Sequence, residues 1–176
     1  NRHDVTLRKY LNNMKTLTIM RHAKSSWKDI SLRDHERPLN KRGHRDAPEM
    51  GRRLKKHGVR PSLIVSSPAV RAWSTAKAVA KEIGYPSEFL EKDPDLYHAS
   101  VERSLDVIVS QDERCNNLML FGHNPGFTDF ANFLVPGLTN NLPTAGIVSV
   151  AIHQDDWNLF EQPPTELLVH DWPKKE

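Results

Sequence analysis

Three short motifs place two arginines and two histidines where they could act on the same anion. Arg21 and His22 end the apolar run of TLTIMRHAKSSWKD, Arg71 ends SSPAVR, and His123 lies in GHNPG. A guanidinium binds a phosphoryl-type oxyanion through two donors and stays charged, whereas an imidazole can attack or donate a hydrogen bond. These residue types therefore indicate phosphoryl chemistry.

The four side chains suggest distinct roles in such a reaction. Arg21 and Arg71 would hold the phosphoryl group while a neutral His22 attacks phosphorus. Two neighbouring guanidiniums disfavour a third positive charge, so they would lower the pKa of His22 and leave its ring unprotonated near neutral pH. His123 would donate to the phosphoryl oxygens or orient the bound group.

Buried strands are predicted immediately before each motif. Short apolar runs bounded by turn residues predict strands at 15–21, 62–67, 116–122 and 146–153, and a terminal hairpin or pair of edge strands from WNLFEQ and TELLVHDW. Helical spacing predicts helices at 44–57, preceded by an irregular turn around Pro48, at 68–83 with Ser67 as its cap, at 100–109, and within NPGFTDFANFL.

The alternation of strands and helices predicts the fold class. It is typical of an α/β protein with a mostly parallel central sheet that helices cover on both faces, an α/β/α sandwich. Ligands of such sheets bind beyond the carboxyl ends of the strands. The three motifs would therefore meet at one edge of the sheet.

Composition limits the classes of protein to consider. The 176 residues include 25 Lys and Arg against 22 Asp and Glu, a net charge of +3, and the two signs are interspersed. This balance does not favour a nucleic-acid partner, and no apolar run reaches the roughly 18 residues that a membrane span needs. Because a single cysteine excludes an internal disulfide framework, we expect a cytoplasmic protein.

The domain organisation is expected to be simple. Residues 1–13 are polar, lack an apolar targeting region and precede Met14, so they are interpreted as a leader or extension. Residues 14–176 have the length of one domain and contain no repeat or linker. We expect a monomer.

Five blocks together resemble a known family: TLTIMRHAKSSWKD, ERPLNKRGHRDAP, SSPAVRAWSTA, LFGHNPGFTDFANFL and NLPTAG. The chain is similar to the SixA-type phosphohistidine phosphatases, in branch 1 of the histidine phosphatase superfamily, over most of residues 15–150. The resemblance implies a phosphoglycerate mutase-like three-layer fold without metal or cofactor. It also implies that His22 is transiently phosphorylated and that Arg21, Arg71 and His123 complete the phosphate pocket.

The same resemblance raises two further candidates for binding the substrate. Lys28 stands where other superfamily members carry an asparagine, so it is either a phosphate ligand or a solvated lysine. Ser25 is open to the same two interpretations. RHA replaces the RHG of many members, which leaves the histidine in place.

The expected proton donor is missing from the sequence. Many superfamily members supply a glutamate after the helix with the second arginine, but the corresponding region reads EKDPDLYHAS. Asp95, Tyr97 and His98 are weak candidates for the acid. Because an imidazole with a pKa of roughly 6.5 leaves phosphorus more readily than an alkoxide, the gap favours a phosphoramidate substrate.

Three hypotheses follow for the activity. The first is a metal-independent phosphatase that acts on phosphohistidine of phosphotransfer proteins through phosphorylated His22. The second is a phosphatase for small phosphorylated metabolites or for phosphoserine and phosphothreonine. The third is a phosphoprotein-binding module with little turnover, against which the intact arginines and histidines argue.

Overall fold

The computed structural model describes residues 14–176, so the predicted leader, residues 1–13, lies outside the described residues. Six strands form one sheet in the order β3-β2-β4-β1-β5-β6. They are β1 (Lys15–Arg21), β2 (Leu63–Ser66), β3 (Glu91–Lys92), β4 (Asn117–Gly122), β5 (Ile147–Ile152) and β6 (Thr165–Asp171).

The sheet is mostly parallel, as predicted. The pairs β1–β4, β4–β2 and β2–β3 are parallel, whereas β5 runs antiparallel to both β1 and β6. The chain must cross over the sheet to place two strands parallel to each other, and the helices form these connections. No helix within residues 14–176 combines the length and apolar character needed to cross a membrane.

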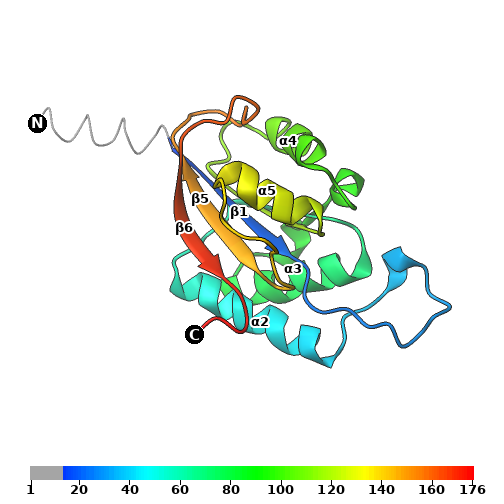
Figure 1. Ribbon diagram of the computed structural model, residues 1–176. Coiled ribbons are helices and arrows are strands. Elements are labelled where there is room, and N and C mark those ends of the chain that lie inside the picture. The colour runs from blue at the N-terminus through cyan, green and yellow to red at the C-terminus, as the bar shows by residue number, and fades with distance from the viewer. Residues whose placement is uncertain (1–13) are drawn as a thin grey trace, which may run out of the picture.

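Helices cover both faces of the sheet (Figure 1). On one face lie α4 (Val101–Val109) and α5 (Gly126–Leu134), and on the other lie α2 (Lys41–Lys56) and α3 (Val70–Ile83). A hydrophobic core lies on each face of the sheet. Leu17 of β1 packs in the core beneath α4 and α5, and Met20 of β1 packs in the core beneath α2 and α3. The α/β/α sandwich is confirmed. Short 3-10 helices span Asp34–Glu36, Ser87–Phe89 and Pro94–Leu96.

The predicted start of α2 is wrong. The helix begins at Lys41 and runs through Pro48 without an irregular turn before it. Asn40 explains the start, because its side chain accepts the Gly43 N–H at 2.9 Å. A proline inside a helix removes one backbone hydrogen bond, and here the buried apolar face packed against α3 outweighs that loss.

The predicted cap of α3 is also wrong. The helix begins at Val70, and its N-cap residue, Ala69, makes no side-chain capping bond. Ser67 instead places its Oγ 2.7 Å from Nε2 of His123. A buried imidazole needs a partner, and that requirement decides where this hydroxyl points.

The predicted terminal hairpin is wrong in its first half. TELLVHDW contains β6, which pairs with β5 at the edge of the sheet, but WNLFEQ forms no strand. Trp157 and Leu159 of that segment are buried in the α4–α5 core instead, and Trp157 donates its indole N–H to the Cys115 carbonyl at 2.8 Å. The apolar spacing reflects core packing rather than strand pairing.

The carboxyl ends of β2, β4 and β1 lie side by side. The register pairs Arg21 with Gly122 and Ser66 with Phe121. One residue further on, the His22 N–H donates to the Gly122 carbonyl at 3.1 Å. The three motifs therefore meet at one edge of the sheet, as the sequence predicts.

A stability prediction follows from the first residue of α5. A Cβ added to Gly126 would lie 1.8 Å from the Ala99 carbonyl oxygen, a backbone atom that cannot rotate away. Gly126→Ala is therefore expected to lower the free energy of unfolding by about 3 kcal/mol in urea denaturation.

The matched control is Gly58→Ala. No heavy atom lies within 4 Å of a Cβ there, although the φ of +77° disfavours alanine. We expect a loss of only about 1 kcal/mol for this control. Equal losses in the two variants would show that the close approach at Gly126 is unimportant.

Candidate active site

His22 lies just beyond β1 and is almost completely buried, with 7% of its surface exposed. Its Nδ1–H donates to the carbonyl of Ala23 at 2.7 Å, so the unprotonated nitrogen of the neutral ring is Nε2. Burial, together with the positive charge of Arg71, lowers the pKa of His22 from 6.5 to about 3, although the bond to Ala23 opposes the shift. The electron pair of His22 therefore lies on Nε2, where it accepts a long hydrogen bond from Nε of Arg71.

The backbone around His22 is held from three directions. Besides the bond to Gly122, the His22 carbonyl accepts the Ala145 N–H at 3.0 Å. Thr75 of α3 accepts the Ala23 N–H through its Oγ1, also at 3.0 Å. The imidazole therefore has little freedom to move relative to the sheet.

The two predicted arginines flank this ring. Arg71 is 2% exposed, and its Nε lies 3.4 Å from Nε2 of His22. Arg21 donates from Nη1 to the Leu142 carbonyl at 3.0 Å, while its buried Nε has no partner among residues 14–176. Burial and the charge of Arg71 lower the pKa of Arg21. A buried donor without a partner is costly, and an oxyanion would satisfy it.

His123 completes the predicted group of four. Its ring is 1% exposed and lies 5.1 Å from the His22 ring, centroid to centroid. Burial, with the nearby His22 and Arg71, lowers its pKa to about 2. Within residues 14–176 the Ser67 hydroxyl has no acceptor other than His123 Nε2, so we assign its proton to that bond, while Oγ accepts the Ala69 N–H. That assignment leaves an N–H on Nδ1, which has no partner within the described residues.

Asp34, which no sequence motif identified, lies next to this group. Its backbone carbonyl accepts Nη1 of Arg71 at 2.6 Å, and its Oδ2 accepts Nη2 of Arg71 at 2.8 Å. Oδ2 also accepts the Tyr97 hydroxyl at 2.6 Å and Nε2 of His98 at 3.1 Å. Burial raises the pKa of Asp34, but these hydrogen bonds outweigh it and hold the pKa well below its usual range.

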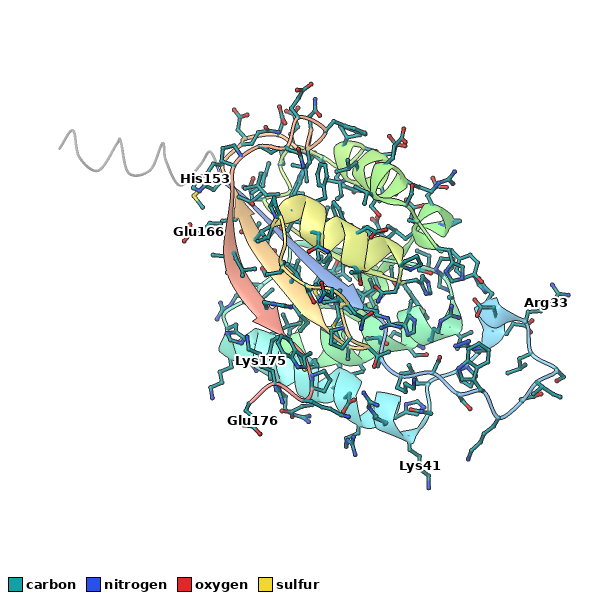
Figure 2. All side chains as sticks on the ribbon, in the orientation of Figure 1. Arg33, Lys41, His153, Glu166, Lys175 and Glu176 are labelled. Carbon is teal, nitrogen blue, oxygen red and sulfur yellow. The ribbon has the colours of Figure 1, made fainter. Side chains whose placement is uncertain are left out.

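A loop between β1 and α2 carries Asp34 to the site. The two ends of the loop are held together, because the Lys24 carbonyl accepts the Asn40 N–H at 3.0 Å and Ser25 forms an antiparallel β-bridge with Leu39. The loop projects beyond the carboxyl end of β1 in Figure 1, and Arg33 points outward from it in Figure 2. Asp34, in contrast, lies on the side of the loop that faces Arg71.

Arg37 is a third buried guanidinium that the sequence did not identify. It donates to Oγ of Ser25 and, at 3.3 Å, to Oδ1 of Asp34, and it stacks 3.4 Å above the Trp27 ring centroid. Ser25, a predicted substrate ligand, is therefore a buried partner of Arg37. Lys28, the other one, is exposed, and its side chain makes no hydrogen bond or ion pair with residues 14–176.

Two of the three candidate acids lie at the site. The rings of Tyr97 and His98 have their centroids 5.4 and 4.9 Å from that of His123. Asp95 is exposed and pairs with Arg103 at 3.1 Å, away from this group. Burial and the bond to Asp34 raise the pKa of Tyr97, so the phenol holds its proton firmly.

Comparisons with known proteins agree with this geometry. The sequence profile of the histidine phosphatase superfamily (branch 1) matches residues 17–101. An uncharacterized chloroplastic protein of Arabidopsis thaliana, At3g52155, is 32% identical over 149 residues, which cover 80% of this chain and 68% of that protein. The chain belongs to branch 1 of the histidine phosphatase superfamily.

Solved structures place this branch 1 histidine phosphatase beside the SixA-type members. The candidate phosphohistidine phosphatase SixA of Agrobacterium tumefaciens is 25% identical with a TM-score of 0.75, covering 90% of this chain and 98% of that one. A phosphoglycerate mutase of Bacillus anthracis, 18% identical with a TM-score of 0.59 over 82% and 90% of the two chains, shares the fold. The SixA-type resemblance and the phosphoglycerate mutase-like fold are confirmed, and they support phosphatase activity.

Across residues 14–176, no group of three or more His, Cys, Asp or Glu side chains is placed to hold a metal ion. The positive charge around His22 comes from the guanidiniums of Arg21, Arg37 and Arg71. The arrangement can bind a phosphoryl group and offer it the Nε2 electron pair.

A pH-dependent stability follows from the lowered pKa of His22. The folded protein keeps His22 neutral down to about pH 3, whereas an unfolded histidine takes up a proton below about 6.5. The unfolded state therefore binds more protons in this window, and the free energy of unfolding falls as the pH drops from 6.5 towards 3. The contribution of His22 is at most about 1.4 kcal/mol per pH unit.

The variant His22→Gln isolates this effect from the other titrating groups. It is expected to lose stability less steeply than the wild type in urea denaturation between pH 7 and about pH 4. Identical slopes for the two proteins would mean that folding leaves the pKa of His22 unshifted.

Proposed function

We propose that this chain is a metal-independent phosphatase that removes the phosphoryl group from phosphohistidine of phosphotransfer proteins. His22 would carry the phosphoryl group between two displacement steps. One observation carries the idea: the unprotonated, buried Nε2 accepts a hydrogen bond from Nε of Arg71, with 3.4 Å between the two nitrogens, and Arg21 Nε and His123 Nδ1 nearby have no partner among residues 14–176. This combination suits a nucleophile that meets an anionic phosphorus centre.

In the first step, Nε2 of His22 forms a bond to phosphorus as the bond from phosphorus to the substrate nitrogen breaks. Arg21 and Arg71 would bind the phosphoryl oxygens, and the Nδ1–H of His123 would donate to a third. The Ala23 carbonyl then holds the Nδ1–H of a phosphorylated, cationic His22. The same hydrogen bond that orients the ring also stabilises the charge that forms on it.

In the second step, water replaces the histidine. The oxygen of water bonds to phosphorus, the bond to Nε2 breaks, and its electron pair returns to His22. The protons of water leave with the phosphate, so the ring is neutral again and keeps its Nδ1–H. Neither step needs a side chain to gain or lose a proton permanently.

The choice of phosphohistidine over phosphate esters rests on the groups around the leaving atom. An alcohol leaves phosphorus only if it receives a proton, yet the carboxylate at the site, Asp34, is ionised and accepts hydrogen bonds. A protonated phosphohistidine already carries the proton that its imidazole needs to depart. The likeness to the SixA protein of Agrobacterium points to the same substrate class.

Phosphate monoesters are the alternative substrates, and one observation favours them. Tyr97 and His98 lie against His123, and His98 could bring a proton to an ester oxygen. Small phosphorylated metabolites, phosphoserine or phosphothreonine would then be hydrolysed as well as phosphohistidine. Comparing the two substrate classes distinguishes these alternatives.

The setting proposed with this activity is a monomer of one domain, residues 14–176, in the cytoplasm. The partner is a phosphorylated protein rather than a nucleic acid or a membrane. The chloroplastic relative from Arabidopsis makes the plastid the alternative compartment.

The decisive experiment measures hydrolysis of a phosphohistidine-bearing phosphotransfer domain and of para-nitrophenyl phosphate, with chelator present. Wild type is expected to prefer phosphohistidine, and His22→Ala to lose at least about a thousandfold in kcat/KM, because the nucleophile is gone. Radiolabelled phosphate should become attached to wild-type His22 in an acid-labile bond.

The matched control is His153→Ala. His153 is exposed and lies at the end of the sheet opposite the projecting loop (Figure 2). Its replacement is expected to leave both activities within about twofold. Unchanged turnover in His22→Ala would exclude this mechanism, and a wild-type preference for the ester would favour the alternative substrates.

A further inference from the structure

The Asp34 carboxylate contacts the side chains of the proposed site, and the proposed mechanism gives it no role. It lies across Arg71 from the nucleophile: Nε of Arg71 approaches His22, while Nη1 and Nη2 bind Asp34. Its side chain remains 41% exposed, although its partner Arg71 is buried. Asp34 therefore borders both the phosphoryl pocket and solvent, where a leaving group would depart.

The contacts of Asp34 make it a fixed acceptor. Oδ2 receives hydrogen bonds from Arg71, Tyr97 and His98. Oδ1 receives only a longer bond, 3.3 Å, from Arg37. Each carboxylate oxygen carries two lone pairs, so Oδ1, with one long bond, can accept a further donor, whereas Oδ2 already shares its lone pairs among three donors. That donor would have to come from a bound molecule or from water.

The charge balance of the proposed reaction identifies such a donor. A phosphohistidine protonated on its second ring nitrogen is an imidazolium that bears a phosphoryl group. When neutral His22 attacks, the electron pair of the breaking bond goes to the departing nitrogen, and the substrate leaves as a neutral imidazole. The cationic ring is then His22, whose Nδ1–H is bound to the Ala23 carbonyl.

The phosphoryl group therefore passes between two similar imidazoles. In each, the ring nitrogen that is not bonded to phosphorus carries an N–H that needs an acceptor. Ala23 supplies that acceptor for His22. We propose that the Asp34 carboxylate supplies the acceptor for the substrate. It would bind the ring N–H of phosphohistidine and so select substrates whose phosphorylated ring is a cation over esters. An ester offers no such N–H, and its alcohol carries no positive charge.

Because this role rests on the proposed phosphohistidine activity, the test uses two small substrates, N-phosphorylimidazole and para-nitrophenyl phosphate. Asp34→Asn removes the charge and keeps the size of the side chain. Its kcat/KM for N-phosphorylimidazole is expected to fall roughly tenfold further than that for the ester, the difference between a charged and a neutral acceptor. Asp34→Glu keeps the charge and should keep the wild-type ratio within about threefold.

The ratio of the two kcat/KM values and one control variant separate selection of the substrate from positioning of Arg71. Asp34 also binds Arg71, so a role confined to holding that guanidinium would lower kcat/KM for both substrates equally. Asp95→Asn removes an exposed carboxylate that pairs with Arg103 outside the site, and it should leave the ratio unchanged.

Each outcome has one meaning. A selective loss in Asp34→Asn supports the role proposed for Asp34. An unchanged substrate ratio in that variant overturns it, even if both activities fall, and leaves the phosphohistidine activity standing. Failure of the wild type to hydrolyse N-phosphorylimidazole or phosphohistidine would overturn the proposed function and this role together.

Discussion

The parallel pairing of β1 with β4 is the constraint on which the site depends. It sets Arg21 opposite Gly122, so that the next residue of each strand, His22 and His123, leaves the sheet at the same level. β2 adds Ser67 on the other side of β4, and that hydroxyl holds His123. A shift of one residue would turn these side chains to opposite faces, because neighbouring residues of a strand alternate.

Electrostatics at this edge are built from an excess of positive charge around two neutral rings. Arg71 lies close enough to Arg21 and to Arg37 for its charge to lower the pKa of both, and a nearby anion relieves such repulsion. Asp34 offsets part of that charge by binding both Arg37 and Arg71. The same charges, together with burial, keep His22 and His123 unprotonated. The site thereby combines two neutral imidazoles with positively charged guanidiniums.

Much of the fold could be predicted from the sequence because the strands are short apolar runs with clear boundaries. Strand ends meet at one edge in any parallel sheet, so the proximity of Arg21, His22, Arg71 and His123 followed from order alone. Errors arose where tertiary contacts override a local pattern. Pro48 stays within α2, and the spacing of Trp157 and Leu159 reflects burial in the core.

Asp34 and Arg37 could not have been found in this way. They lie in a polar loop without periodicity, and the contact of Asp34 with Tyr97 joins residues 63 positions apart. No spacing rule encodes such a contact, because the course of the loop decides it. Ser67 carried a signal that pointed to a different role, since a serine before a proline is typical of a helix cap.

The joined ends of the loop between β1 and α2 have an evolutionary consequence. Lys24 and Asn40 close the loop with a backbone hydrogen bond, so residues between them can be exchanged or inserted at little cost to the sheet. His22 is bound to the sheet through Gly122, whereas Asp34 belongs to the loop. Descendants of this chain could therefore change the residues around Asp34 by altering one segment, while His22 stays in its ancestral position.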